Sequence, residues 1–380
     1  MPTITCFPLG NADCSRIDLD DGRQMLVDFA DVRSGYDLAG TLRADLDAKK
    51  RAGYDVVAFT HFDRDHIHGA SDFFWLDWAE KYQGEGRAKI GTLWVPAAAI
   101  LETGNTGNSR VLRQEARYRL EHNYGIRVFS SPGLLDDWLR NVKGIDPASR
   151  RHLFVDAGTL VPDFSLGTDG VEFFAHSPFA TRSEQGAVIN RNKDCLAFQA
   201  TFNVGGRTTR AHFFADLTAD EIAQIVDVTE WHGRNTDATR YDRLRWNVFH
   251  LPHHSSYLSL HPTDRGKTKT TPLPSVGRLY EDYGQAGAIL ISTSRPVQTY
   301  TDNDPPHKEA ARYYRDVAEG HGDRTKYVVT MEHPSVREPK PLVIRIDSAG
   351  AALVKAVPTG WGAGAVVGAS RPSSSVIDHG

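Results

Sequence analysis

The feature that most constrains this chain is a cluster of metal-binding side chains that directly follows an apolar run. The apolar run, residues 54–60, has the length and composition of a buried strand. Four residues of metal-binding type follow within six positions: His61, Asp63, Asp65 and His66. A strand that ends in this way places the cluster in a loop at its carboxyl end, where the side chains can converge. A continuous helix would point residues at these spacings in different directions.

Aspartate and histidine are also ordinary loop residues, and an isolated His-x-Asp sequence is most often a solvated turn. Four such residues in six positions, next to a buried strand, are much harder to obtain by chance. We therefore interpret this segment as a metal site.

The same arrangement, a predicted strand that ends in a possible ligand, recurs farther along the chain. Predicted strands end at His176, at Asp216 and near the pair His253 and His254. Successive side chains of a strand point to opposite faces, so the two neighbouring histidines cannot both face one centre unless the strand ends between them. We expect one of them to bind metal and the other to hold a leaving oxygen or support a ligand.

All the predicted ligands named above are histidines or aspartates, which offer nitrogen or oxygen atoms, and none is a cysteine. Six or seven such ligands are too many for one tetrahedral ion and suit two divalent ions that share a carboxylate and a water. Asp63 supplies a hard oxygen ligand, which moves the expected metal from Zn²⁺ alone towards Mn²⁺ or Mg²⁺. We predict two divalent metal ions, Zn²⁺ or Mn²⁺, as cofactors. His68, His250 and His261 are interpreted as surface or supporting histidines.

Two motifs carry a resemblance to a known family. The segment His61-Phe62-Asp63-Arg64-Asp65-His66 resembles the His-x-His/Asp-x-Asp-His signature of the metallo-β-lactamase superfamily. Aspartate at its third position resembles the soluble domain of ComEC/Rec2-type DNA-uptake proteins. Residues 246–256 are similar to the family's Val-Pro-His-His-Gly-Ser motif, with Ser255 in place of glycine. The likeness extends from residue 4 to about residue 346.

A weaker likeness lies at the start of the chain and before the helix predicted from Lys308. The family opens with a Gly-x-x-Asp turn and a strand that ends in aspartate, and Asp13 and Asp28 fall at these places. A simple turn-forming role explains Asp13 equally well. His307 lies where the family has a histidine before a helix, although the order of the prolines differs.

The resemblance implies a fold, a ligand arrangement and a class of chemistry. The fold would be an α/β protein, a four-layer αβ/βα sandwich of the metallo-β-lactamase type. One metal would be held by His61, Asp63 and His176, and the other by Asp65, His66 and one of His253 and His254. Asp216 would lie between the metals, Asp65 and His254 would take part in hydrolysis, and His307 would contact substrate.

A local excess of basic residues lies between positions 81 and 151, with twelve Lys and Arg against seven Asp and Glu. Residues 108–122 are predicted as a helix that carries Arg110, Arg113 and Arg117 on one face. A solvated helix face explains this stripe. The functional alternative is a surface that contacts substrate phosphates near the metals.

Length and composition set the wider limits. The 380 residues are interpreted as a single domain over 1–357, with insertions at about 70–150 and 258–287. Residues 261–287 are predicted as a surface loop, and 358–380, rich in Gly, Ala, Ser and Pro, as a disordered tail. No apolar run approaches the roughly 20 residues that span a bilayer, and no signal peptide is visible. We therefore expect no membrane contact, and the three scattered cysteines favour a cytoplasmic protein without a disulfide framework.

Three functions are compatible with these features. The first is a phosphodiesterase or nuclease that acts on nucleic acid or nucleotides, supported by the two-metal ligand set and the arginine stripe. The second is a hydrolase of a small-molecule lactone, thioester or β-lactam, favoured by the net charge of −4, which argues against a dedicated nucleic-acid binder. The third, a metal-stabilised interaction module, explains the nearly complete ligand set least well. The sequence does not predict an oligomeric state.

Overall fold

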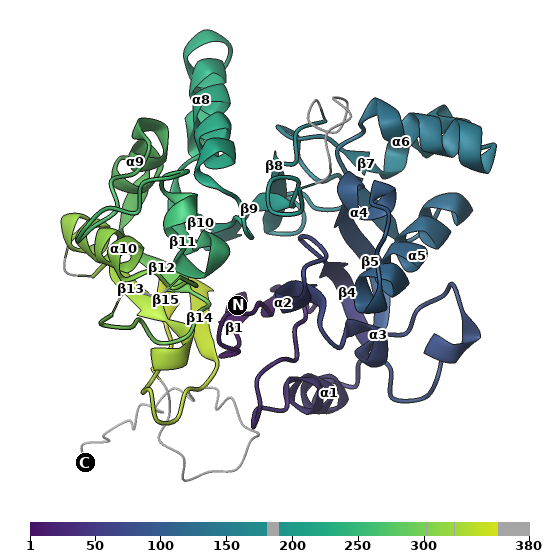
Figure 1. Ribbon diagram of the computed structural model, residues 1–380, viewed down its shortest axis with the longest axis horizontal. Helices are drawn as coiled ribbons and strands as arrows, with labels where there is room; N and C mark the ends of the chain where they lie inside the picture. The colour runs from purple at the N-terminus through teal and green to yellow at the C-terminus, as the bar shows by residue number, and fades with distance from the viewer. Residues whose placement is uncertain (181–189, 301–302, 323, 356–380) are drawn as a thin grey trace, which may run out of the picture.

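Two β-sheets face each other, and helices cover both outer faces (Figure 1). The computed structural model describes residues 1–180, 190–300, 303–322 and 324–355, so the predicted tail, 358–380, lies outside the described residues. Helices and core clusters follow the order helix, sheet, sheet, helix, which confirms the predicted αβ/βα sandwich.

The first sheet has nine strands in the described part of the chain. In spatial order these are β15 (Gly350–Leu353), β14 (Leu342–Asp347), β1 (Thr3–Cys6), β2 (Ser15–Asp18), β3 (Gln24–Val27), β4 (Gly53–Ala58), β5 (Lys89–Pro96), β6 (Ile126–Phe129) and β7 (Phe154–Val155). Neighbouring strands from β3 to β7 are parallel. Their carboxyl ends therefore meet at one edge of the sheet.

The second sheet has six strands within the described ranges. They follow the order β13 (Lys326–Val329), β12 (Gly284–Ser292), β11 (Trp246–His250), β10 (Arg207–Phe213), β9 (Ala197–Val204) and β8 (Val171–Ser177). Strands β10 to β13 are parallel, and Phe213 pairs with His250. The residues that follow Phe213 in β10 and His250 in β11 therefore begin side by side at the same edge of the sheet.

Three hydrophobic layers hold the sandwich together. The central layer lies between the sheets, where Trp94 of β5 packs edge-on against Phe173 and Phe198 of the second sheet, with ring centroids 5.4 and 6.2 Å apart. The outer layers join each sheet to its helices. Because apolar side chains fill both faces of each sheet, polar ligands are left to the strand ends.

The helices divide between the two outer layers, as Figure 1 shows. The first sheet is covered by α1 (Leu38–Ala48), α3 (Ala70–Phe73), α4 (Ala97–Leu101), α5 (Gly107–His122) and α6 (Gly133–Asp137). The second is covered by α8 (Ala219–Asn235), α9 (Pro274–Glu281) and α10 (Lys308–Gly320). In the described part of the chain, no helix is long and apolar enough to cross a membrane.

Helix α9 corrects the prediction of a surface loop over residues 261–287. Pro274 begins the helix at a position where a proline costs no hydrogen bond. Val276, Leu279 and Tyr280 then recur at helical spacing and are fully buried against the second sheet. The overall Thr, Lys, Pro and Gly content of the segment concealed this short amphipathic pattern.

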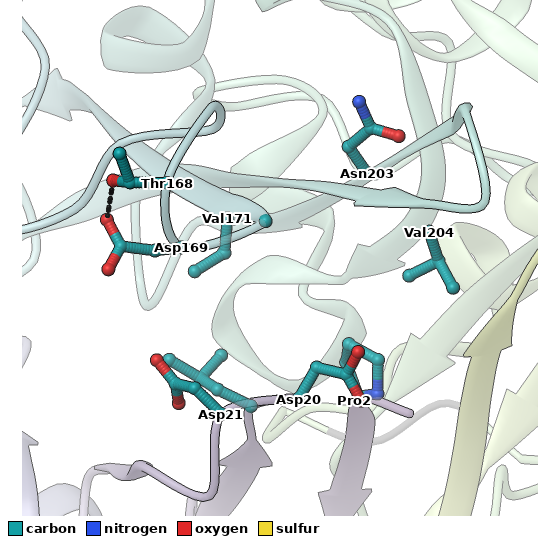
Figure 2. Close-up of a pocket in the computed structure, with 10 residues that line it drawn as sticks. Pro2, Asp20, Asp21, Thr168, Asp169, Val171, Asn203 and Val204 are labelled. Carbon is teal, nitrogen blue, oxygen red and sulfur yellow. Dashed lines mark hydrogen bonds between the residues drawn. The ribbon is translucent and has the colours of Figure 1, made fainter.

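A cavity of about 290 Å³ lies at the end of the sandwich opposite the carboxyl ends of β3 and β10 (Figure 2). The β2–β3 turn and the adjoining ends of β8 and β9 line it, including Asp21 and Asp169. Arg23 forms ion pairs with both carboxylates, at 2.6 and 2.7 Å, and Thr168 donates to Asp169. The negative charges of Asp21 and Asp169 are therefore balanced by Arg23.

Candidate metal centre

The carboxyl ends of four strands, two from each sheet, bring the predicted ligands to one edge of the sandwich. Strand β3 leads to Asp28 and β4 to His61, while β10 leads to Asp216 and β11 to the pair His253 and His254. Backbone hydrogen bonds tie these segments together: Asp28 N–H donates to Ala58, and His253 N–H donates to Ala215. The parallel pairing of the strands therefore builds the site.

The segment that carries the predicted ligands His61, Asp63, Asp65 and His66 contains a short helix, although it was predicted as a loop. Residues Arg64–Ile67 form the single-turn helix α2, which begins after Asp63. His66 N–H donates to the Asp63 carbonyl, and Asp13 N–H donates to the Asp65 carbonyl. One helical turn places His66 inward while Asp63 and Asp65 stay partly exposed, with 36% and 37% of their side-chain surfaces accessible.

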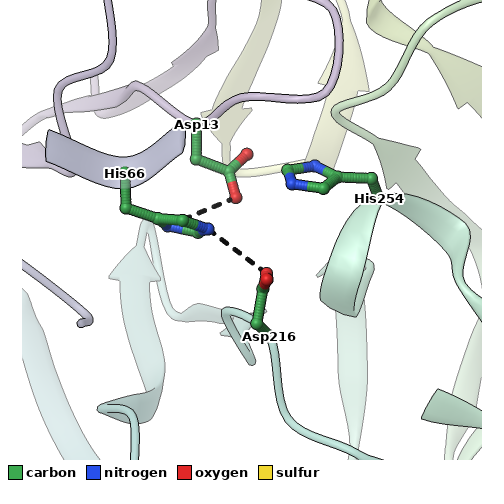
Figure 3. Close-up of side chains that lie close together, drawn as sticks. All are labelled: Asp13, His66, Asp216 and His254. Atoms are coloured by element: carbon green, nitrogen blue, oxygen red, sulfur yellow. Dashed lines mark ion pairs between the residues drawn. The ribbon is translucent and has the colours of Figure 1, made fainter. Parts of the chain in front are cut away.

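Four buried side chains face one another at the centre of the site (Figure 3). They are Asp13, His66, Asp216 and His254, and one ligand atom from each lies within 4.8 Å of the others. The Nε2 atom of His66 is 3.3 Å from Oδ1 of Asp216, while its Nδ1 atom, which lies 2.9 Å from Asp28, is 3.8 Å from Oδ2 of Asp13. Two carboxylates and two imidazoles at this spacing match the ligand preferences of a divalent cation.

A second group of ligands surrounds the other oxygen of Asp216. Its Oδ2 atom lies 3.9 Å from Nε2 of His61 and 3.9 Å from Nε2 of His253. His61 Nε2 is also 3.4 Å from Oδ2 of Asp63. On the first side, Oδ2 of Asp65 lies 3.3 Å from Nε2 of His254. Asp216 therefore stands between two sets of ligand atoms.

Hydrogen bonds fix which nitrogen of each central histidine faces the site. Nδ1 of His66 lies 2.9 Å from the Asp28 carboxylate, and Nδ1 of His254 lies 2.7 Å from the carbonyl oxygen of Thr293. Both partners only accept, so Nδ1 carries the proton in each ring and Nε2 presents a lone pair when the ring is neutral. This is the orientation that metal-binding histidines need.

The His253–His254 pair reaches the site because the strand ends before it. Strand β11 ends at His250, and His253, His254 and Ser255 all have left-handed backbone angles, with φ of 49°, 54° and 62°. Such angles normally favour glycine, yet Ser255 holds this position through a 2.7 Å hydrogen bond from its hydroxyl to Ser292. The turn that Ser255 supports thus places both histidines near the centre.

The charges of the site are strongly coupled. Burial would raise the pKa of Asp216, but His66, His253 and His254 outweigh burial and hold that pKa well below its usual range. Burial would lower the pKa of His66, yet Asp216 and Asp28 raise it well above its usual value. Asp65, Asp13 and Asp216 likewise outweigh burial and raise the pKa of His254, so without a cation protons on His66 and His254 balance the carboxylates.

Several buried polar atoms at the centre have no hydrogen-bond partner, although burying such atoms unsatisfied is costly. They are Nε2 of His61, Nε2 of His66, Oδ1 of Asp13 and Oδ1 of Asp216. Divalent cations bound at the centre would give these atoms partners, so the residues fit a metal site. Burial keeps the pKa of the nearby Cys14 and Cys195 thiols well above the usual value, so neither is poised to act as a thiolate ligand.

His176 is not brought to this group. Its ring lies against Phe174, His212 and Phe214, with centroids 5.1 to 5.4 Å apart. Its neighbour Ala175 faces the central layer between the sheets, and strand alternation turns His176 to the opposite face. The ring contacts of His176 are therefore with Phe174, His212 and Phe214, and its buried Nε2 atom has no hydrogen-bond partner among the described residues.

The predicted arginine stripe is largely occupied within the protein. Arg113 donates to the carbonyl of Glu102 at 2.5 Å, and Arg117 donates twice to the carbonyl of Ile100, at 2.9 and 2.6 Å. These contacts satisfy the carboxyl end of helix α4, while Arg110 is exposed. Arg113 and Arg117 therefore hold helix α5 against the carboxyl end of helix α4.

His307 is buried and holds the loop that follows the histidine pair. Its Nδ1 atom accepts from the backbone N–H of Tyr257 at 3.2 Å, and its own backbone N–H donates to the carbonyl of Ser255. Nε2 lies 3.2 Å from the carbonyl oxygen of Asn303. These contacts support the position of the His253–His254 turn.

Three residues contribute more to the site than the sequence predicts. A turn-forming role explains Asp13 in the sequence as well as a metal-binding role does, yet Asp13 is one of the four central side chains. His250, interpreted as a supporting histidine, lies with Nε2 3.4 Å from Oδ1 of Asp13. Asp28 orients His66. The strand that ends at Asp28 and the polar turn at Asp13 were the available signals.

No family model matches the sequence, and no curated protein matches it. Among solved structures, a diphosphatase from the PhnP family is similar, with 13% identity, coverage of 80% of this chain and 92% of that chain, and a TM-score of 0.32. Zn²⁺-bound PqqB from Methylobacterium extorquens is similar over 90% of this chain and 99% of that chain, with 10% identity and a TM-score of 0.41. BJP-1, a subclass B3 metallo-β-lactamase of Bradyrhizobium japonicum, is similar over 73% and 90%, with 16% identity and a TM-score of 0.30. At such values the function must be argued from the side chains of this protein.

Proposed function

We propose that this protein is a metal-dependent hydrolase with a dinuclear centre, and that it cleaves phosphodiesters in nucleic acid or nucleotides. The observation that carries the proposal is the position of Asp216. Oδ1 of this carboxylate faces His66 at 3.3 Å, whereas Oδ2 faces His61 and His253 at 3.9 Å each. A carboxylate flanked in this way suits a bridge between two cations.

The ligands divide into two sets on this proposal. His61, Asp63 and His253 would hold one ion, so that His253 takes the place first predicted for His176. Asp13, His66 and His254 would hold the other ion, with Asp65 at its solvent side. Both histidines of the pair would then be ligands, one for each ion.

The exposure and position of the proposed ligands indicate where substrate would bind and which residue would accept a proton. Asp63 and Asp65 are the most exposed of the proposed ligands, His253 is 20% exposed, and the other proposed ligands are buried, so substrate would approach from the side of Asp63, Asp65 and His253. Two divalent ions, when bound by these residues, would supply Lewis acidity and an activated water. Asp65, 3.3 Å from His254, is positioned to accept a proton from an attacking water. His254, with its Nδ1 held by Thr293, keeps a fixed orientation beside it.

The test compares substrate classes on the same preparation. The full chain, loaded with Mn²⁺ or Zn²⁺, is assayed with bis-p-nitrophenyl phosphate, a single-stranded oligonucleotide, a lactone, a thioester and a chromogenic β-lactam. We expect turnover of the phosphodiesters, lost in Asp216→Asn and retained in the surface variant Asp137→Asn. Turnover confined to the lactone, thioester or β-lactam would overturn the substrate class and favour the small-molecule alternative.

A further inference from the structure

A cavity of about 360 Å³ adjoins the metal-binding segment on its outer side. Phe62, Arg64 and Ile67 form one wall, and these residues alternate in sequence with the predicted ligands. Residues 104–109, which include the start of helix α5, form the opposite wall, and Arg191 lines the cavity as well. The cavity is therefore built on the same short segment as the metal centre.

The charged side chains that line the cavity are those of Arg64 and Arg191, and no carboxylate residue of the described chain lines it. Arg191 is already paired with Asp63 and Glu102, each at 2.8 Å. Arg64 is exposed and forms no ion pair with the described residues. Arg191 links the two regions, because its Nη1 atom donates to Oδ1 of Asp63 at 2.8 Å while its Nη2 atom donates to Asn105 at 2.9 Å. An anion in the cavity would meet a free guanidinium.

The start of helix α5 adds backbone donors. The helix has 16 residues, and the side chain of its capping residue, Thr106, makes no capping hydrogen bond. The first N–H groups of a helix lack partners within the helix and carry partial positive charge. Gly104 and Gly107 have φ of +76° and +53°, and an added Cβ at either would meet nothing within 4 Å. The backbone is thus open to close approach by a ligand.

Asn105 provides the independent sign of a missing ligand. The residue is only 9% exposed, and it lines the cavity. Its Oδ1 atom accepts from Arg191, whereas its buried Nδ2 atom has no hydrogen-bond partner. Buried amide donors are rarely left unsatisfied. An acceptor group bound in the cavity would receive a hydrogen bond from Nδ2 of Asn105.

We propose that this cavity binds a phosphate group of the substrate that flanks the phosphodiester attacked at the metal centre. The unpaired Arg64, the unsatisfied Nδ2 of Asn105 and the open start of α5 are all donors, and a phosphodiester of a substrate backbone offers only acceptor oxygens at neutral pH. The inference rests on the proposed phosphodiesterase function and deepens it. It names the preferred substrate as one with at least two phosphates along its backbone.

The first test measures a preference ratio. Three thymidine dinucleotides share one phosphodiester and carry no terminal phosphate, a 5′-phosphate or a 3′-phosphate. We expect one phosphorylated dinucleotide to show a kcat/KM about tenfold above that of the unphosphorylated one, the factor expected for one charge-assisted hydrogen bond. Asn105→Asp keeps an acceptor for Arg191 but places a negative charge where the phosphate would lie. This variant and Arg64→Ala should bring the ratio close to one, whereas the surface control Arg140→Ala should keep it.

The second test measures phosphate binding in the absence of metal ions. Inorganic phosphate is titrated calorimetrically into the full chain in the presence of EDTA, so that no cation can hold the anion. We expect saturable binding that weakens at least about tenfold in Asn105→Asp and stays unchanged in Arg140→Ala. Equal binding in all variants, or none in the wild type, would overturn the phosphate site.

The two tests separate the failure of this inference from failure of the proposed function. Hydrolysis of phosphodiesters with no preference for either phosphorylated dinucleotide overturns the cavity's role and leaves the function standing. Phosphate binding that depends on Asn105, without hydrolysis of any phosphodiester, overturns the proposed function and supports the anion site alone.

Discussion

The Nδ1 atom of His66 lies 2.9 Å from the Oδ2 atom of Asp28, and both side chains are buried. Asp28 also accepts hydrogen bonds from the backbone N–H and the hydroxyl of Thr60, each at 2.8 Å. This small network joins the end of β3 to the end of β4. It turns Nε2 of His66 towards Asp216 and therefore sets the geometry of the candidate metal centre.

Asp28→Asn tests this positioning role. Asparagine has nearly the same shape and tolerates the positive φ of 57° at this residue, so we expect the fold to persist by circular dichroism. Loss of the carboxylate removes the charge that orients His66 and should weaken metal binding roughly 10- to 100-fold. Asp137→Asn, an exposed carboxylate, is the matched control. Unchanged affinity in a metal titration of Asp28→Asn would contradict the role.

A pair of histidine variants tests the division of the ligands. His253→Gln should lose about one ion per chain on elemental analysis, because its Nε2 atom lies 3.9 Å from Asp216. His176→Gln should keep the full metal content, since its ring lies among Phe174, His212 and Phe214. The opposite pattern, with metal lost only in His176→Gln, would restore the ligand set implied by the family resemblance.

Much of the site could be predicted because buried strands and their last residues leave a clear pattern. Apolar runs followed by His61, Asp216 and His254 mark strand ends, and parallel strands bring such ends to one edge. The side to which His176 points could not be inferred, because it depends on the register of β8 against the second sheet. Asp13 was ambiguous because aspartate serves turns and metals equally well.

The helical stripe of arginines illustrates a second limit. Spacing along α5 correctly placed Arg113 and Arg117 on one side of a helix, but it did not reveal what that side contacts. The partners are carbonyl groups at the end of α4, which no local pattern encodes. Composition likewise concealed α9, since its few buried residues lie among many polar ones.

Arg117→Ala should therefore affect stability more than substrate binding. The variant loses two hydrogen bonds to Ile100 and the stacking of the guanidinium over Trp138, whose ring centre is 5.1 Å away. We expect the free energy of unfolding, measured with urea, to fall by about 1–3 kcal/mol. The salt dependence of oligonucleotide cleavage should match the wild type. A flatter salt dependence with unchanged stability would instead indicate that Arg117 contacts substrate phosphates.

The thermal shift caused by metal should grow with pH. Burial alone would lower the pKa of His254, but Asp65, Asp13 and Asp216 outweigh burial and raise it to about 9 from an ordinary 6.5. The stability that this protonated histidine adds without metal is fully present below pH 6.5 and is lost as the pH rises through 9. Metal binding requires the neutral ring, so it strengthens over the same window. A melting-temperature increase with Mn²⁺ that is larger near pH 6.5 than near pH 9 would contradict this coupling.

The metal content of the full chain tests the central claim most directly. The protein is loaded with Mn²⁺ or Zn²⁺, dialysed against metal-free buffer and analysed for elements, beside Asp216→Asn and the control Asp137→Asn. Because the two oxygens of Asp216 face separate ligand sets, we expect about two ions per chain in the wild type and the control, and clearly fewer in Asp216→Asn. Only trace metal in the wild type, or equal content in all three proteins, would contradict a dinuclear centre built around Asp216.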